Sequence, residues 1–246
     1  MLAFDLDTGL INWARPLSPL DAWQLACGTI GGSVSRNETL CPFHPGPDAD
    51  FGMAPTFVPA SKNTPFGKDV VVIGQKNGVL HAISAQAGTH FWSTITSPDG
   101  SGGGVSWGIA VDDSQVYFTA DNSGLLEWTP KSTSKQIKNS GFGAASLTDG
   151  SLVWEIAAPG DSISVVPPSV VNDVVLTGYT NVNSNGSGPG AMLVLDKMTG
   201  RIMKQYPLDQ QYHGGITIQD SFIMFGTGYS NSTTYNGTGE FHVWSV

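Results

Sequence analysis

The sequence has few charges, only two cysteines and no long apolar run. Only 13% of its 246 residues are charged, and 11 basic against 20 acidic side chains give a net charge of −9. Because the lysines and arginines form no cluster, nucleic acid and anionic membranes are poor partners. No apolar stretch approaches the roughly 20 residues of a transmembrane helix. Cys-x-x-Cys-His is also absent, so attached c-type haem is not predicted.

Glycine and apolar residues, in contrast, are plentiful. The chain contains 31 glycines, and 40% of its residues are hydrophobic. Such a composition is apolar enough to fill a core, and it favours a turn-rich β protein over helices or disorder.

Several features indicate a secreted, extracellular glycoprotein. Four Asn-x-Ser/Thr sequons stand in polar, Gly/Ser-rich stretches, at Asn37, Asn185, Asn231 and Asn236. We expect Cys27 and Cys41 to form a disulfide, which would close a loop of about 15 residues and contribute roughly 3 kcal/mol. The alternative is two unpaired thiols. The N-terminus lacks the basic and apolar regions of a signal peptide, so we expect the true N-terminus to be lost.

An eleven-residue motif occurs four times. The copies are AFDLDTGLINW (3–13), AISAQAGTHFW (82–92), AASLTDGSLVW (144–154) and VLDKMTGRIMK (194–204). Glycine stands seventh in every copy, and tryptophan stands eleventh in all but the last, where Lys204 replaces it. Each copy predicts a strand, a tight turn at the glycine and an outer strand. The spacing varies because residues 16–53 and 121–142 are insertions.

Two further strands precede each full copy, as in APTFVP and DVVVIGQK, where Asn77-Gly78 predicts a type I′ turn. Four antiparallel strands per repeat predict an all-β propeller. We expect full blades at 54–95, 107–158 and 165–206, the outer half of a blade at 1–15, an insertion loop at 16–53 and a last blade without its outer strand at 213–246. Trp13, Trp92 and Trp154 are expected to be buried at equivalent places.

Both ends of the chain fall at the third strand of a blade. GEFHVWSV at the end matches GVLHAISA (78–85) position by position. Propellers commonly close by letting the N-terminus supply the outer strand of the last blade. We therefore expect the missing part to be N-terminal.

Five further stretches, in order, carry a family resemblance. They are DLDTGLINWARPLSPLDAWQLAC, CPFHPGPDADFGMAP, GQKNGVLHAISAQAG, GGGVSWGIAVDD and GGITIQDSFIMFGTGY. The chain resembles pyrroloquinoline quinone (PQQ) alcohol dehydrogenase propellers, and within them the polyvinyl-alcohol-dehydrogenase-like branch. The resemblance implies an eight-bladed fold, PQQ near its axis over a Ca²⁺ ion, and an alcohol or sugar substrate.

The resemblance also implies site residues. The Asp-x-Asp-Phe-Gly match makes Asp50 the candidate catalytic base and Asp48 its neighbour, because alcohol oxidation needs a proton acceptor. The alternative is that both carboxylates cap strand ends. Lys76 matches the cofactor-contacting position, the alternative being a solvated turn lysine. Trp107 stacks on a flat ligand or packs between blades. His213 faces the channel or is structural.

The sequence departs from the family in two places. In the larger methanol-dehydrogenase-like relatives an Asp follows the Asp-x-Trp element, whereas Gln24 follows Asp21-Ala22-Trp23 here. The stacking tryptophan and the Ca²⁺ ligands of the family come from earlier blades, and the histidines, His44 included, form no metal-ligand cluster. We therefore expect this chain alone to be inactive, with no metal ligands assigned. The alternative function is a non-catalytic secreted propeller that acts as a binding scaffold.

Overall fold

The computed structural model describes residues 1–18, 21–28, 35–98, 103–183, 186–228 and 238–245. The predicted sequons at Asn185, Asn231 and Asn236 lie outside these ranges. Within them, no helix is long and apolar enough to cross a membrane.

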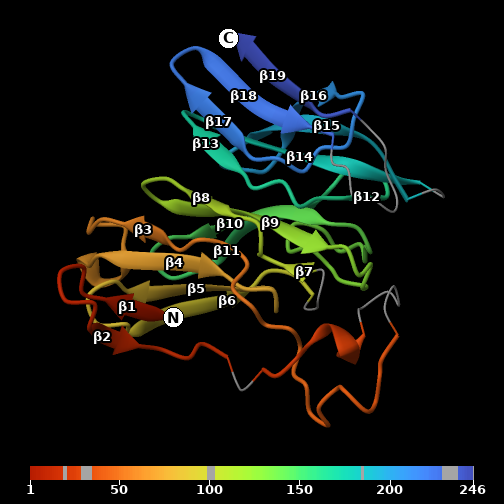
Figure 1. Cartoon of the computed structure of the whole chain (residues 1–246). Coiled ribbons are helices and arrows are strands. Elements are labelled where there is room, and N and C mark those ends of the chain that lie inside the picture. The colour runs from red at the N-terminus through yellow and green to blue at the C-terminus, as the bar shows by residue number, and fades with distance from the viewer. Residues whose placement is uncertain (19–20, 29–34, 99–102, 184–185, 229–237, 246) are drawn as a thin grey trace.

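The described residues form five antiparallel sheets, which confirms the predicted all-β propeller class (Figure 1). The first sheet pairs β1 (Leu2–Phe4) with β2 (Ile11–Ala14), and the second has the order β3 (Thr56–Val58), β4 (Val70–Gly74), β5 (Val79–Ser84), β6 (His90–Ile95). In the third, β7 (Gly103–Gly104) and β8 (Ile109–Val111) pair with β9 (Gln115–Asn122), followed by β10 (Gly141–Ser146) and β11 (Leu152–Ala157).

The last two sheets repeat this arrangement. In the fourth, β12 (Ser162–Ile163) and β13 (Ser169–Val171) pair with β14 (Val174–Asn183), followed by β15 (Gly186–Asp196) and β16 (Ile202–Pro207). The fifth contains β17 (Ile216–Gln219), β18 (Phe222–Thr227) and β19 (Glu240–Ser245). Two 3-10 turns, η1 (Leu25–Cys27) and η2 (Pro65–Gly67), lie in loops. The division of the chain into blades at the predicted limits stays a proposal.

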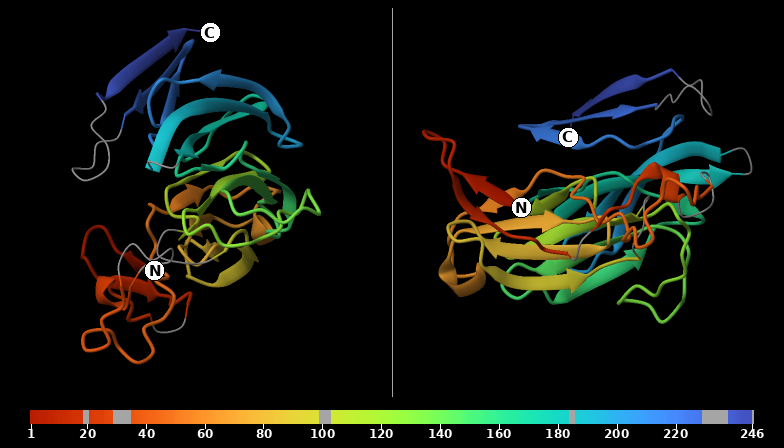
Figure 2. Two further views of the ribbon diagram at one scale, coloured as in Figure 1. Left: turned by 90° about the vertical axis from the view of Figure 1, so that its right-hand side faces the viewer. Right: turned by 60° about the horizontal axis from the view of Figure 1, so that its bottom comes forward.

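The sheets follow one another in chain order around an arc (Figure 2). From the second sheet onward, consecutive sheets bury apolar side chains against each other, so the core consists of layers between sheets. The three layers are centred on Val72, Leu80 and Phe118, on Tyr117, Tyr179 and Leu193, and on Leu176, Met192 and Phe225. Because the sheets pack face to face, they bury apolar surface against one another and form a core without helices.

The turn glycines of the four motif copies have one geometry. Gly9, Gly88, Gly150 and Gly200 have φ between 62° and 73°, and each donates its N–H to the carbonyl oxygen four residues earlier, at 2.8–2.9 Å. An L-residue rarely adopts this φ, which explains why glycine recurs there.

The predicted type I′ turn at Asn77-Gly78 is wrong. Gly78 has φ 76° and donates its N–H to the Gln75 carbonyl at 3.0 Å, so it occupies the last position of the turn. A type I′ turn needs positive φ at two central residues, and Asn77 does not have it. The loop is one residue longer than the dipeptide suggested, which places Lys76 inside the turn.

The three motif tryptophans join consecutive sheets. The indole N–H groups of Trp13, Trp92 and Trp154 donate to the carbonyls of Ala85, Leu147 and Lys197 in the following sheet, at 2.9–3.1 Å. Each ring covers the turn glycine of that sheet: a Cβ at Gly88, Gly150 or Gly200 would lie 2.4–2.6 Å from it. The prediction of equivalent places is confirmed. Trp92 and Trp154 are buried as expected, whereas Trp13 is half-buried.

Candidate functional site

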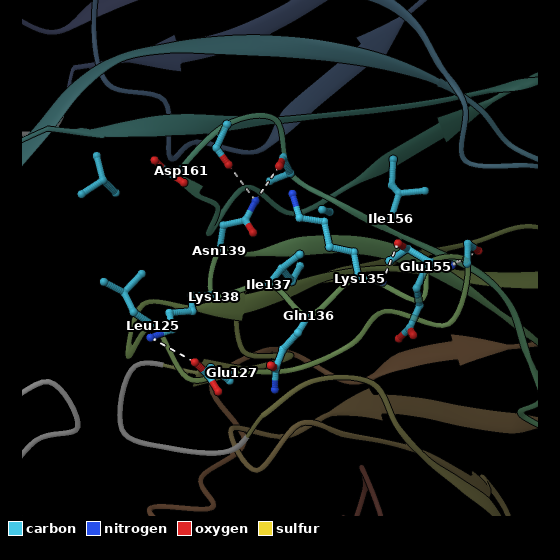
Figure 3. Close-up of a pocket in the computed structure, with 16 residues that line it drawn as sticks. Leu125, Glu127, Lys135, Gln136, Ile137, Lys138, Asn139, Glu155, Ile156 and Asp161 are labelled. Carbon is cyan, nitrogen blue, oxygen red and sulfur yellow. Dashed lines mark hydrogen bonds and ion pairs between the residues drawn. The ribbon is translucent and has the colours of Figure 1, made fainter.

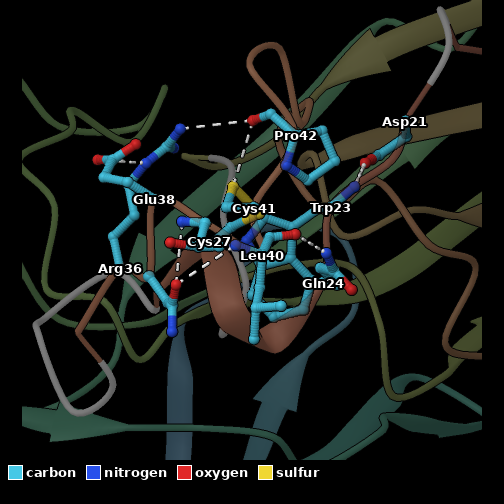
Figure 4. Close-up of a disulfide and its surroundings, with 11 residues drawn as sticks. Asp21, Trp23, Gln24, Cys27, Arg36, Glu38, Leu40, Cys41 and Pro42 are labelled. Atoms are coloured by element: carbon cyan, nitrogen blue, oxygen red, sulfur yellow. Dashed lines mark hydrogen bonds and ion pairs between the residues drawn. A yellow bond between two sulfur atoms is a disulfide. The ribbon is translucent and has the colours of Figure 1, made fainter.

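A disulfide braces the long loop that follows the first sheet. Cys27 and Cys41 are bonded, with their Cα atoms 4.8 Å apart, which confirms the predicted pair (Figure 4). Between them, the exposed Asn37 accepts the N–H of Cys41 through its carbonyl oxygen at 2.9 Å. Arg36 pairs with Glu38 at 2.8 Å. The bridge closes the loop segment that leads to the candidate acidic residues.

Asp21 fastens the end of this loop. Its Oδ1 accepts the N–H of Trp23 at 3.0 Å, and its Oδ2 accepts the N–H of Ala49. The Ala22 N–H donates to the Pro45 carbonyl at 2.7 Å. The Asp-x-Trp element therefore holds residue 49, which stands between the two candidate carboxylates. In the sequence, this element stood out only as a difference from the larger family members. Its contact with Ala49 was not predicted.

The structure brings Asp48, Asp50 and Lys76 together. The Lys76 Nζ donates to both Asp48 carboxylate oxygens, at 3.2 and 3.3 Å, and to Asp50 Oδ2 at 3.3 Å. The backbone supports the pairing, since the Lys76 N–H donates to the Asp50 carbonyl at 3.0 Å. One ammonium thus stands between two carboxylates, at the turn after β4.

The two carboxylates differ in their surroundings. The Asp48 side chain is only 3% exposed, whereas 73% of the Asp50 side chain is exposed. Asp48 also has φ 65°, a left-handed conformation that aspartate tolerates better than most residues. Asp48 is therefore the buried anchor of the lysine, and Asp50 is the carboxylate that a solute can reach.

Burial and charge oppose each other in this cluster. Burial raises the pKa of Asp48, although the hydrogen bonds and charge of Lys76 act to lower it. For Lys76, burial alone would lower the pKa, but the hydrogen bonds and charges of Asp48 and Asp50 outweigh it and raise the pKa. The lysine is consequently a firmly protonated hydrogen-bond donor at neutral pH.

Trp107 lies on the neighbouring segment. Gly52 packs against Ser106, since a Cβ on Gly52 would lie 3.0 Å from the Ser106 carbonyl oxygen. The Trp107 side chain is exposed, and its indole N–H donates to Asp121 Oδ2 at 3.2 Å. Asp121 is buried, which raises its pKa to about 6 against the hydrogen bonds of Ser123 and Trp107. Sequence reasoning missed Asp121, although a lone acidic residue ending an apolar strand was a visible signal.

His213 stands apart from this cluster, ahead of β17 in the last sheet. Its Nε2 lies 3.2 Å from Gln211 Oε1, and burial lowers its pKa. A neutral, half-buried histidine bonded to a nearby glutamine fits the structural alternative for this residue.

A cavity lies beside the outer strand of the third sheet. This cavity of about 850 Å³ is covered by the insertion after β9, and its lining includes Ile137, Asn139, Glu155 and Asp161 (Figure 3). The Asn139 amide donates to the Ala158 and Gly160 carbonyls. The cavity lies on a different sheet from Lys76, and neither Lys76 nor the two candidate carboxylates line it.

Glu155, next to this cavity, is a buried acid with one bonded oxygen. Its Oε2 accepts the Lys131 N–H at 2.8 Å, while Oε1 has no hydrogen-bond partner among the described residues. Burial raises the pKa of Glu155 to about 7, although the Lys131 N–H and charge act to lower it. A carboxyl of this kind is more easily buried as the neutral acid.

Glu155→Gln is expected to stabilise the protein at pH 8 and to have little effect at pH 4.5. Because the pKa in the folded protein is raised above the ordinary glutamate value of 4.5, the wild type loses stability as the pH rises from about 4.5 to about 7. Glutamine keeps an acceptor for Lys131 and carries no charge, so we expect a gain of about 2 kcal/mol at pH 8. Urea unfolding of variant and wild type at both pH values measures this difference in unfolding free energy. An equal difference at pH 4.5 and pH 8 would contradict a raised pKa at Glu155.

The described residues contain no group of three or more His, Cys, Asp or Glu side chains placed to hold a metal ion. Lys76 occupies both carboxylates of its cluster. These residues therefore do not by themselves form the Ca²⁺ site that the family resemblance implies. They do present a cation and an accessible carboxylate side by side, which suits contact with a carbonyl oxygen and acceptance of a proton.

No family model matches the chain. It is 28% identical to a polyvinyl alcohol dehydrogenase of Sphingopyxis sp. (strain 113P3) over 163 residues, 66% of this chain and 23% of that protein. It is 23% identical to a polyvinyl alcohol dehydrogenase of a Pseudomonas species over an alignment covering 96% of this chain and 36% of the relative. The chain thus spans about a quarter to a third of these proteins.

Among solved structures, the quinohemoprotein alcohol dehydrogenase of Comamonas testosteroni matches 98% of this chain and 41% of its own, with a TM-score of 0.57 and 13% identity. At this identity the likeness shows the fold alone. Together with the curated relatives, it confirms the resemblance predicted from the motifs: the chain is similar to PQQ alcohol dehydrogenase-like propellers of the polyvinyl-alcohol-dehydrogenase type.

Proposed function

We propose that this chain forms part of a PQQ-dependent oxidoreductase that acts on an alcohol or a sugar, in a protein of its relatives' length. The observation that carries the proposal is the ion cluster in which Lys76 contacts both Asp48 and Asp50. The family resemblance alone assigned these residues to one site, and they lie within hydrogen-bond distance in the fold.

Each residue has a role in this proposal. Bound PQQ would supply the acceptor for the hydride that leaves the alcohol carbon. The Lys76 ammonium would help to hold it, as a hydrogen-bond donor to a quinone carbonyl oxygen that stabilises negative charge there. Asp50 accepts the hydroxyl proton at a carboxylate oxygen that solvent reaches. Asp48, which is buried, holds the ammonium in place. Trp107 offers an exposed aromatic face on the adjoining segment for a flat ligand.

The cofactors are proposed for the larger protein. The two carboxylates and the Lys76 ammonium together carry a net charge of −1. This charge does not favour binding of an anionic quinone unless a metal cation or further basic groups lie nearby. We propose that Ca²⁺ and the remaining contacts come from residues beyond this cluster. Extracellular location and glycosylation at the exposed Asn37 belong to the same proposal, and the disulfide supports them.

The proposal is tested on this chain and on a full-length protein that contains it. PQQ binding is followed by fluorescence, and alcohol oxidation by a dye-coupled assay with Ca²⁺ present. We expect turnover only in the full-length protein. Asp50→Asn should lower kcat by at least about 100-fold, the usual range for loss of a general base, with little change in PQQ affinity. Lys76→Ala should weaken PQQ binding, turnover or both.

The chain offers a matched control for Lys76. Lys197 is similarly half-buried and pairs with two aspartates, Asp112 at 3.5 Å and Asp173 at 3.8 Å. Lys197→Ala should leave PQQ binding unchanged. Equal losses from the two lysine variants would contradict the site. A full-length protein that binds no PQQ would favour the second candidate, a non-catalytic scaffold.

A further inference from the structure

A buried glutamine next to Lys76 reaches across to the candidate loop. The Gln75 side chain is fully buried, and its Nε2 donates to the Ala49 carbonyl at 2.6 Å and to the Ser18 hydroxyl at 3.0 Å. Ala49 stands between Asp48 and Asp50. Since Asp21 accepts the Ala49 N–H, both backbone polar groups of this one residue are bonded to side chains.

A buried histidine orients that glutamine. His81 on β5 is only 3% exposed, and its Nε2 lies 3.0 Å from Gln75 Oε1. Its Nδ1 lies 2.8 Å from the Ser93 hydroxyl, which in turn lies 2.5 Å from His90 Nε2 at the exposed edge of β6. The chain of contacts runs across the sheet from its outer strand to the loop.

The donors and acceptors of this chain have one consistent direction. Because Gln75 Nε2 donates to Ala49, its Oε1 is an acceptor, so His81 Nε2 must carry a proton. A neutral His81 then accepts from the Ser93 hydroxyl at Nδ1. Burial, with a smaller contribution from the charge of His90, lowers the pKa of His81 to about 4, so the ring is neutral at pH 7. Every member therefore fixes the orientation of the next.

We infer that Gln75 and His81 are positioning residues that hold the Asp48–Asp50 segment on Lys76. Neither residue touches Lys76 Nζ in the contacts described above; they act through the Ala49 carbonyl. The inference rests on the proposed function only for its effect on catalysis, because the geometry of the ion cluster is measurable without any cofactor.

The left-handed backbone at Asp48 explains why such a support is needed. A non-glycine residue at φ 65° is disfavoured and persists where its surroundings fix it. The bonds of Asp21 and Gln75 to the next residue provide that constraint. Without Gln75, the segment is expected to relax, and both carboxylates to move away from the ammonium.

The last sheet provides a matched control. His242 occupies the position of β19 that corresponds to His81, by the match of 239–246 to 78–85, and its Nε2 lies 2.8 Å from the Thr227 hydroxyl. This pair has the same place in its sheet as His81 and Gln75. Its contacts are with Glu240 and the rings of Phe225 and Trp244, so it does not support the candidate loop.

The test is competitive acetylation of the 246-residue chain, with the rate at each lysine read by mass spectrometry. Only the neutral amine reacts, so release of the carboxylates lowers the Lys76 pKa and speeds its labelling. Gln75→Met should raise the Lys76 rate roughly threefold or more, as a pKa fall of about half a unit implies. Lys197 in the same molecule should react at its wild-type rate, and Thr227→Val should change neither lysine.

His81→Leu is the second variant, and it keeps the contact between Gln75 and Ala49. We expect a smaller rise at Lys76 than in Gln75→Met, in protein whose circular dichroism shows it folded. Wild-type labelling of Lys76 in both folded variants would overturn the inference. Because PQQ and substrate are absent from this experiment, its failure is distinct from failure of the proposed function. If turnover is established, Gln75→Met should lower kcat with little change in KM.

Discussion

Replacing Trp154 by alanine is expected to destabilise the protein by about 3–5 kcal/mol, the usual cost of emptying a large buried aromatic site. The ring is 3% exposed, covers Gly200 and donates to the Lys197 carbonyl at 2.9 Å. Its loss leaves a cavity between the third and fourth sheets and an unpaired carbonyl. Urea unfolding measures the change. Phe43→Ala, at an aromatic residue that is 87% exposed, is the control and should stay within about 0.5 kcal/mol.

The partner of this ring gives a stricter test. Gly200→Ala places a methyl group 2.4 Å from the Trp154 ring, at φ 71°, and should also destabilise strongly. Since the clash disappears when the ring is absent, the double variant should be more stable than the sum of the two single effects predicts, by at least about 1 kcal/mol. Additive effects of the two substitutions would mean that the Trp154 ring does not pack against Gly200.

The second large effect is expected at the disulfide. Removing it with Cys27→Ser and Cys41→Ser should cost roughly 3 kcal/mol in the loop-entropy model for about 15 residues. We expect the loop that ends at Asp48 to open most readily in this variant, because the bridge restricts the segment that Asp21 and Gln75 hold in place. Limited proteolysis should then cut within residues 21–45 first.

The matched control for the cysteine pair is the reduced wild type, whose behaviour should equal that of the double serine variant. If the double variant resists proteolysis as well as the oxidised protein does, the other loop contacts hold the loop in place without the disulfide, which contradicts this prediction.

The propeller class could be predicted from the sequence because its determinants are local and repeated. The turn glycine has the same φ and the same backbone hydrogen bond in all four copies, and the tryptophan of each of the first three copies covers the turn glycine of the next sheet, so the pattern survives insertions. The type I′ turn at Asn77-Gly78 was mispredicted because a dipeptide does not specify the loop length. Here the position of Gly78 in the turn depends on where β4 ends and where its partner β5 begins.

The candidate site was predictable only in part. The family resemblance identified Asp48, Asp50 and Lys76, but not which carboxylate is buried. That depends on how Asp21 holds the loop, and on Gln75 in the turn after β4, and such long-range contacts leave no spacing pattern in the sequence. A signal did exist for both residues, since His81 is a polar residue within the apolar strand β5 and Gln75 directly follows the apolar strand β4, where an unbonded buried polar group is costly.

We propose that the Lys76 cluster forms one side of a quinone site. The most direct measurement is a crystal structure of a full-length protein containing this chain, grown with PQQ and Ca²⁺. We expect a quinone carbonyl oxygen within hydrogen-bond distance of Lys76 Nζ, with Asp50 facing the substrate side and Asp48 still buried against the lysine. PQQ bound elsewhere on the propeller, with Lys76 paired only to its two aspartates, would contradict it.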